Sequence, residues 1–112
     1  MPITDAAGAH AYLAGMYRDA YFPDHLVDKG RAILVALRER IETERPADLP
    51  ALYVLTNAAA EEFNALQEEF WAADSEIETA ARDDIALSFE HVMAACGFAD
   101  ADPEEALAER DW

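Results

Sequence analysis

Carboxylates dominate the side chains of this 112-residue chain that could do chemistry: there are 24 Asp and Glu, against eight Lys and Arg and three His. They are unevenly distributed, because residues 1–45 contain six basic residues and seven acids, whereas residues 46–112 contain two basic residues and seventeen acids. The formal charges of the two parts are therefore −1 and −15, which together give −16. Such a net negative charge opposes binding to polyanions, so we expect no nucleic-acid binding. It either attracts a cationic partner or keeps the protein soluble.

The leading hypothesis follows from the negative excess after residue 45. A folded acidic surface attracts a basic protein by electrostatic steering, which speeds association. We therefore predict a small acidic helical interaction protein, of the antidote, immunity or regulatory type, that binds a basic protein partner. The residues assigned to that partner are Glu61, Glu62, Glu68, Glu69, Glu76, Asp83, Asp84 and Glu90.

An alternative hypothesis is a small-molecule-binding or catalytic site made of polar groups. Uncharged amides beside Tyr and Trp suit a polar pocket or an interface, because they lose less on desolvation than carboxylates do. The structural alternative is that Tyr53 and Trp71 pack under a neighbouring helix while the amides satisfy loop backbone. The candidates are the corner Tyr21, Asp24, Asp28 and Lys29, the stripe Tyr53, Asn57, Asn64, Gln67 and Trp71, and Arg82.

A third possibility is a structural homodimer, held by Tyr53 and Trp71 or by matched lines of charge. Three arginines and three acids each recur at seven-residue intervals, the repeat that keeps side chains on one side of a helix. The two lines can pair within a monomer, pair between two copies, or be separately solvated, so the chain is a monomer or a homodimer. The lines are Arg31, Arg38 and Arg45, and Glu76, Asp83 and Glu90.

The sequence lacks the signatures of enzymes and metal sites. None of the three histidines has a Glu three residues before it, as a di-iron bundle requires. Cys96 and His91 are five residues apart, a spacing that does not place two ligands on one helical face. Glycines are scattered, so there is no phosphate-binding loop. We expect no enzyme, no metal and no cofactor.

Length and composition predict one helical domain over residues 1–112. The sequence is 53% hydrophobic, which provides a core, and no apolar run reaches the roughly 20 residues that span a membrane. The segment Met1–Asp5 lacks the basic and apolar parts of an export signal, and a single cysteine fits a reducing compartment. We expect a cytoplasmic protein that does not bind membranes.

The first half of the chain contains start and stop signals for two helices. One is expected from Asp5 to Ala20, ending before Pro23, which disfavours helix in the preceding residue. The other is expected over Asp24–Glu44, where apolar residues recur at spacings of three and four and Pro46 ends the helix. Gly30 lies on the apolar side of this second helix, which predicts a close helix crossing.

Three further helices are expected in the second half. Asp48 is the N-cap of a helix of about six turns. Ser75 and Glu78 form a capping box for the next, which Gly97 ends, and Asp102 begins a short last helix. No segment alternates at period two for long enough to be a strand. The fold class is therefore all-α, a compact bundle of four main helices plus a short C-terminal fifth.

Several motifs are specific enough to identify a family and together cover most of the chain. They are Tyr21-Phe22-Pro23-Asp24 with Leu26-Val27-Asp28-Lys29-Gly30, Phe63-Asn64-Ala65-Leu66-Gln67 with Glu69-Phe70, Ser75-Glu76-Ile77-Glu78-Thr79 with Ala81-Arg82-Asp83, and Arg110-Asp111-Trp112. In these motifs the sequence resembles a family of small acidic bacterial proteins of unknown function. The resemblance implies a bacterial cytosolic setting and transfers no catalytic residue.

Overall fold

The computed structural model describes residues 12–112, and these form five helices and no strand. Three of the helices are long, and the prediction of an all-α bundle with a short C-terminal helix is confirmed. The bounds are α2 (Ala14–Arg18), α3 (Asp24–Glu44), α4 (Leu49–Ala72), α5 (Thr79–Ala95) and α6 (Pro103–Ala106).

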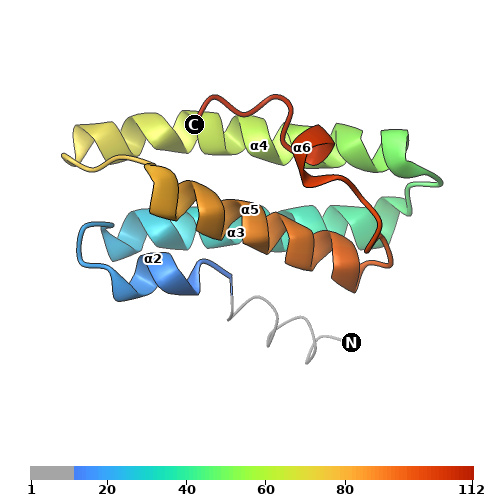
Figure 1. Cartoon of the computed structure of the whole chain (residues 1–112), viewed down its shortest axis with the longest axis horizontal. Helices are drawn as coiled ribbons and strands as arrows, with labels where there is room; N and C mark the ends of the chain where they lie inside the picture. The colour runs from blue at the N-terminus through green and yellow to red at the C-terminus, as the bar shows by residue number, and fades with distance from the viewer. Residues whose placement is uncertain (1–11) are drawn as a thin grey trace.

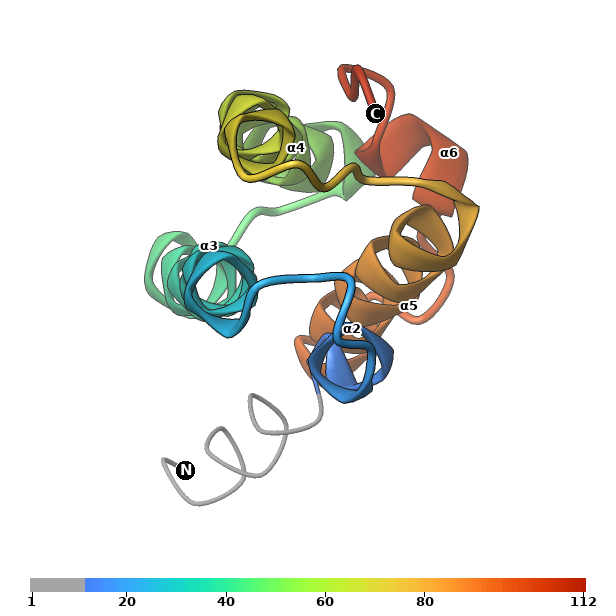
Figure 2. The same cartoon turned by 90° about the vertical axis from the view of Figure 1, so that its left-hand side faces the viewer.

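The three long helices form the frame of the bundle (Figure 1). α3 and α4 are antiparallel neighbours, and α5 lies across them. Seen from one end, α2 lies beside α3 and α5, while α6 lies at the opposite side, in contact with both α4 and α5 (Figure 2). α4 and α5 approach each other less closely than α3 and α4 do, so α6 and the residues after it close the space between them. No helix among the described residues is long and apolar enough to cross a membrane.

The bounds predicted for α3 and the start predicted for α4 are confirmed. α3 occupies Asp24–Glu44, and it ends where Arg45 adopts a φ of 49° before Pro46. The N-cap of α4 is Asp48, whose side chain accepts a hydrogen bond from the amide of Ala51 at 3.0 Å. An N-cap carboxylate satisfies one of the amides that have no partner within the helix, which fixes the first turn.

The predicted first helix is wrong in its described part, because it is not continuous to Ala20. Residues 5–11 lie outside the described residues. Leu13 has a φ of 59°, which a continuing right-handed helix excludes, and α2 covers only Ala14–Arg18. Burial offsets the cost of this conformation, since Leu13 is 1% exposed and its amide donates to the hydroxyl of Ser88 at 3.2 Å.

The capping box predicted at Ser75 is also wrong. α5 begins at Thr79, and the hydroxyl of Ser75 donates instead to the carbonyl of Tyr21 at 2.9 Å. Ser75 thereby joins the loop before α5 to the corner before α3, and it is buried. The predicted end of α5 is confirmed, because Gly97 has a φ of 94° and the amide of Phe98 donates to the carbonyl of Met93 at 2.8 Å.

The predicted close crossing at Gly30 is confirmed. Gly30 is buried on α3, and a Cβ atom there would lie 3.0 Å from both Leu13 Cδ1 and Phe63 Cε1. The residue therefore lets α3 pack against α4 and the start of α2 at once. Phe63 in turn contacts Phe89 of α5, with 5.8 Å between the ring centroids, so this point joins all the long helices.

Candidate functional site

The polar stripe of α4 holds the C-terminal part of the chain, residues 102–112, which we call the strap. Asn57 brackets it with both atoms of its amide: Nδ2 donates to the carbonyl of Glu105 at 3.0 Å, and Oδ1 accepts from the amide of Glu109 at 2.9 Å. Two turns further on, Asn64 repeats the arrangement. Its Nδ2 donates to the carbonyl of Glu109 at 2.9 Å and its Oδ1 accepts from the amide of Asp111 at 2.6 Å.

Tyr53 and the apolar residues of α4 complete the attachment. The hydroxyl of Tyr53 accepts a hydrogen bond from the amide of Asp102 at 2.9 Å, where the strap begins. At the other end Trp112 is only 8% exposed; its ring centroid lies 5.9 Å from that of Phe63, and its Nε1 donates to the carbonyl of Ala60 at 3.4 Å. The sequence left open whether these amides line a polar site or satisfy loop backbone. In the structure, the amides of Asn57 and Asn64 satisfy backbone groups of the strap.

The remaining residues of the stripe have different surroundings. Gln67 is buried, 6% exposed, whereas Trp71 near the end of α4 is 51% exposed. Glu68, one turn before Trp71, is also exposed. Trp71 is therefore an aromatic side chain in a strongly acidic part of the surface, and it does not pack under a neighbouring helix.

The corner between α2 and α3 is held by pairs of side chains. The hydroxyl of Tyr17 donates to Asp28 Oδ1 at 2.5 Å, and Lys29 Nζ lies 2.6 Å from Glu69 Oε1 on α4. Asp24 is exposed in the first turn of α3. Tyr17 was not among the predicted site residues; its spacing to Asp28 crosses a corner, which no helical periodicity indicates.

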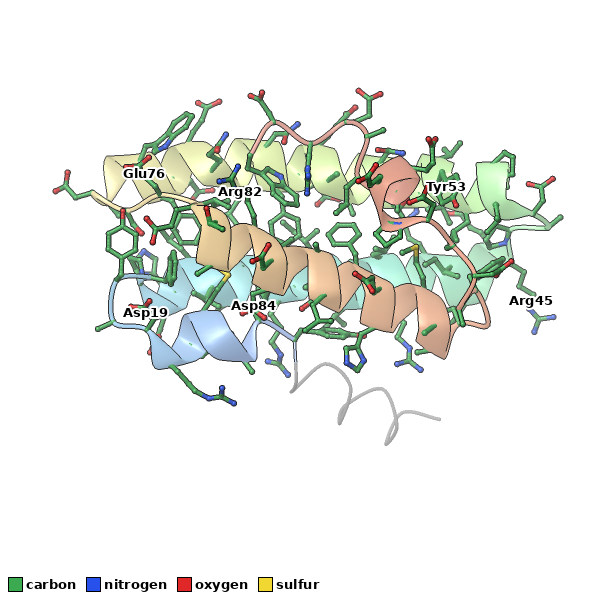
Figure 3. The ribbon with its side chains drawn as sticks, viewed as in Figure 1. Asp19, Arg45, Tyr53, Glu76, Arg82 and Asp84 are labelled. Carbon is green, nitrogen blue, oxygen red and sulfur yellow. The ribbon has the colours of Figure 1, made fainter. Side chains whose placement is uncertain are left out.

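Tyr21 lies at the same end of the bundle and is 40% exposed. Partial desolvation, and then the negative charges of Glu76 and Glu78, raise the pKa of Tyr21 above its ordinary value. The acids of the loop before α5 therefore set a negative potential around this aromatic side chain. Figure 3 places Glu76 and Asp19 at this end and Arg45 at the other.

Arg82 lies apart from the strap contacts and from the α2–α3 corner pairs. Its guanidinium is exposed and donates from Nη2 to Thr79 Oγ1 at 3.1 Å, within the first turn of α5 (Figure 3). Tyr53 is at the far side of the strap, close to α6. Lys29 thus pairs with Glu69, and the amides of Asn57 and Asn64 bind the strap. Arg82 contacts neither the corner residues nor the residues of the polar stripe.

The predicted partner-binding acids divide into engaged and available groups. Glu69 pairs with Lys29, and Asp84 Oδ2 accepts a hydrogen bond from the amide of Met16 at 2.9 Å, at the start of α2 (Figure 3). Asp84 is thus a helix cap supplied by another helix, a role that sequence spacing does not reveal. The acids that remain exposed without a hydrogen bond or ion pair among the described residues are Glu61, Glu62, Glu68, Glu76, Asp83 and Glu90.

The two charge lines do not form a ladder. Glu76 precedes α5, so only Asp83 and Glu90 of the acidic line are on that helix. On α3 the side chain of Arg38 is 10% exposed and pairs with Glu42 at 3.2 Å, one turn further along the same helix. Arg45 is exposed at the end of α3. Arg38 of the arginine line therefore forms its ion pair within α3.

The described residues outline hollows elsewhere on the surface. One of about 260 Å³ lies along α5 and the following loop, with Leu87, His91 and Phe98 among its lining residues. Another of about 520 Å³ lies between the ends of α3 and α5, beside Arg45 and Cys96. No group of three or more His, Cys, Asp or Glu side chains within residues 12–112 is arranged to hold a metal ion.

Comparisons with known proteins place the chain in a family but give it no activity. Residues 6–112 match a family described as "Family of unknown function (DUF5713)", and the chain belongs to that family. No curated protein matches the sequence. No solved structure matches it either.

Proposed function

We propose that this member of a family of unknown function is a small acidic interaction protein that binds a basic protein partner, as antidote proteins and some regulators do, in a bacterial cytosol. The observation that carries the proposal is the number of carboxylates on α4 and α5 that are exposed and engaged with no cation among the described residues. Glu61, Glu62 and Glu68 on α4 are in this state, as are Asp83 and Glu90 on α5.

Three cations among the described residues form ion pairs with acids other than these five. Arg38 and Arg40 each pair with a Glu four residues further along α3, at 3.2 Å and 2.9 Å. Lys29 is shared with Glu69 of α4, at an exposed position. Exposed ion pairs contribute only about 0–1 kcal/mol each to the stability of the fold. These pairs form within the chain and leave no charge for a partner. The unpaired carboxylates are the groups with charge left for a partner.

Trp71 supplies the apolar anchor that a charged surface needs for affinity. It is 51% exposed, and Trp is enriched among the residues that dominate binding energy at interfaces. Its indole ring attracts Lys and Arg side chains. The chain itself contains such a contact, because the guanidinium of Arg110 lies 5.4 Å from the centroid of the Trp112 ring. A Lys or Arg side chain of a basic partner can make the same cation–π contact with Trp71.

The experiment is capture from a lysate of the source organism with three forms of the intact protein. The first is the wild type, at low and at high salt. The second carries Glu61→Gln, Glu62→Gln and Glu68→Gln on α4. The third is a control with the same change in net charge, Glu39→Gln, Glu42→Gln and Glu44→Gln on α3, the last two of which also remove the ion pairs of Arg38 and Arg40. Bound proteins are identified by mass spectrometry, and the binding of each is then measured with purified material.

The proposal requires one pattern of results. A basic protein is retained at low salt, is released by high salt, and is lost by the α4 variant but kept by the α3 control. Trp71→Ala should weaken the same complex by about tenfold or more, as expected for an interface anchor. Retention that is equal in the α4 variant and the α3 control would contradict the proposal, because it would reflect net charge alone.

A further inference from the structure

The strap is bound to α4 in the manner of a peptide ligand. Two asparagines make four hydrogen bonds with its backbone, two as donors and two as acceptors, and Tyr53 accepts a fifth; none of the five involves a strap side chain. A primary amide has a donor and an acceptor side by side, so each asparagine satisfies one carbonyl and one amide of the strap: Asn57 spans the turn from Glu105 to Glu109, and Asn64 the irregular segment from Glu109 to Asp111. Recognition of this kind reads the backbone and tolerates many side chains.

Apolar anchors at three positions provide the rest of the contact. Ala106 is 0% exposed, Leu107 is 3% exposed and Trp112 is 8% exposed, while the strap residues between Leu107 and Trp112 are exposed. The Trp112 ring rests on Phe63 and its Nε1 reaches the carbonyl of Ala60. The strap therefore presents a fixed spacing to the surface below it: an aliphatic residue, four exposed positions of which Arg110 lies over the Trp112 ring, and that aromatic ring.

We propose that this face of α4, formed by Tyr53, Asn57, Ala60, Phe63 and Asn64, is a peptide-binding site, and that the strap of a second copy binds there when the site's own strap is released. The second copy is the occupant that the contacts favour, because its strap has the matching spacing of backbone groups and anchors. Of the strap's eleven residues only Pro103–Ala106 are helical, one short turn. Residues 96–101 connect it to α5 outside any helix, so the strap can leave without unwinding α4 or α5.

The tether decides how often exchange occurs. A segment attached by a short linker is present at its site at an effective concentration on the order of millimolar. A free peptide at about 10 µM therefore competes poorly with the intact strap, and the wild type is expected to be closed and monomeric at such concentrations. Weakening the attached strap at its anchor removes the competitor and makes the site accessible.

The test uses the full chain with Trp112→Ala and a fluorescent synthetic peptide with the sequence of residues 102–112. We expect the peptide to bind this variant, as measured by fluorescence anisotropy, and to bind the wild type at least about tenfold more weakly, because the attached strap competes. A peptide in which Ala replaces the Trp should fail to bind. Adding Asn64→Ala to the Trp112→Ala variant should weaken binding by about tenfold, since two backbone hydrogen bonds are lost.

Two outcomes overturn the proposal. The first is a Trp112→Ala protein that keeps the helical circular dichroism of the wild type but does not bind the peptide. If that variant loses its helical signal, hydrogen exchange of the wild type decides: the amides of Glu109 and Asp111 should exchange much faster than those of buried α4 residues such as Phe63, because the strap opens on its own. The second outcome that would overturn the proposal is exchange of the strap amides only at the rate of global unfolding.

Discussion

At the scale of single residues, the pair Tyr17 and Asp28 fixes the corner between α2 and α3. The hydroxyl of Tyr17 donates to Asp28 Oδ1 at 2.5 Å. Burial, and then the hydrogen bond and the negative charge of Asp28, raise the pKa of Tyr17 from 10.0 to about 12. The hydroxyl is thus held in its protonated form, the form that donates the hydrogen bond.

Replacing Tyr17 by Phe should lower the free energy of unfolding by about 1 kcal/mol at neutral pH, the typical contribution of one hydrogen bond. Because the folded pKa is above the unfolded value, this contribution is complete below pH 10 and is lost as the pH rises from 10 towards 12. Urea denaturation of the wild type and of Tyr17→Phe over this range measures it. An ultraviolet titration in which Tyr17→Phe removes no ionisation near pH 12 would contradict the assignment.

Asp84 and Asp83 are adjacent carboxylates with different tasks, and this allows a matched comparison. Asp84 caps α2 through the amide of Met16, while Asp83 is exposed. Asp84→Ala should lower the free energy of unfolding by about 0.5–2 kcal/mol, as loss of an N-cap does. Asp83→Ala should change it by less than about 0.5 kcal/mol, the usual range for surface substitutions. Equal losses in the two variants, measured by urea denaturation, would exclude the capping role.

At the scale of elements, the contact between α3 and α4 depends on the missing side chain of Gly30. A larger residue must displace Leu13 or Phe63, whose atoms would lie 3.0 Å from its Cβ. We predict that Gly30→Leu lowers the free energy of unfolding by about 1–3 kcal/mol through overpacking. The control is Ala36→Leu, at an exposed position of the same helix, which should be close to neutral. A Gly30→Leu variant as stable as the control would show that α3 and α4 are not closely packed there.

Helix bounds were predictable where local signals agree with burial. The apolar period of α3 and Pro46 gave its bounds, and the N-cap Asp48 gave the start of α4, because these signals act within one turn. The first helix and the capping box failed for the opposite reason. Leu13 and Ser75 are fixed by partners more than fifty residues away in sequence, Ser88 and Tyr21, and no local pattern reveals them.

The candidate site was predictable in its residue types and not in its geometry. The polar stripe of α4 was visible from sequence because Asn57 and Asn64 are seven residues apart on a helix. Its occupant was not, since the strap is a short helix, a turn and an irregular end, and the backbone groups that bind the amides carry no sequence pattern. The same limit applied to Glu69, whose partner Lys29 is 40 residues away on another helix.

At the scale of the whole molecule, the fold lays the acids of the strap beside those of α4. The strap contributes Glu104, Glu105, Glu109 and Asp111, all exposed, and the contacts with Asn57 and Asn64 fix it along α4. α4 adds its own unpaired carboxylates. Concentrating like charges in this way costs self-repulsion and strengthens the field that a basic partner meets.

The most direct test of the proposed function is the affinity of the purified basic partner as a function of salt. Between about 0.1 M and about 1 M salt the Debye length falls from about 10 Å to about 3 Å, which removes steering by exposed carboxylates. We predict that the affinity of the wild type falls by about tenfold or more over this range, and that the α4 variant Glu61→Gln, Glu62→Gln, Glu68→Gln binds weakly throughout. An affinity that is the same at both ends of the salt range would contradict an acidic interaction surface.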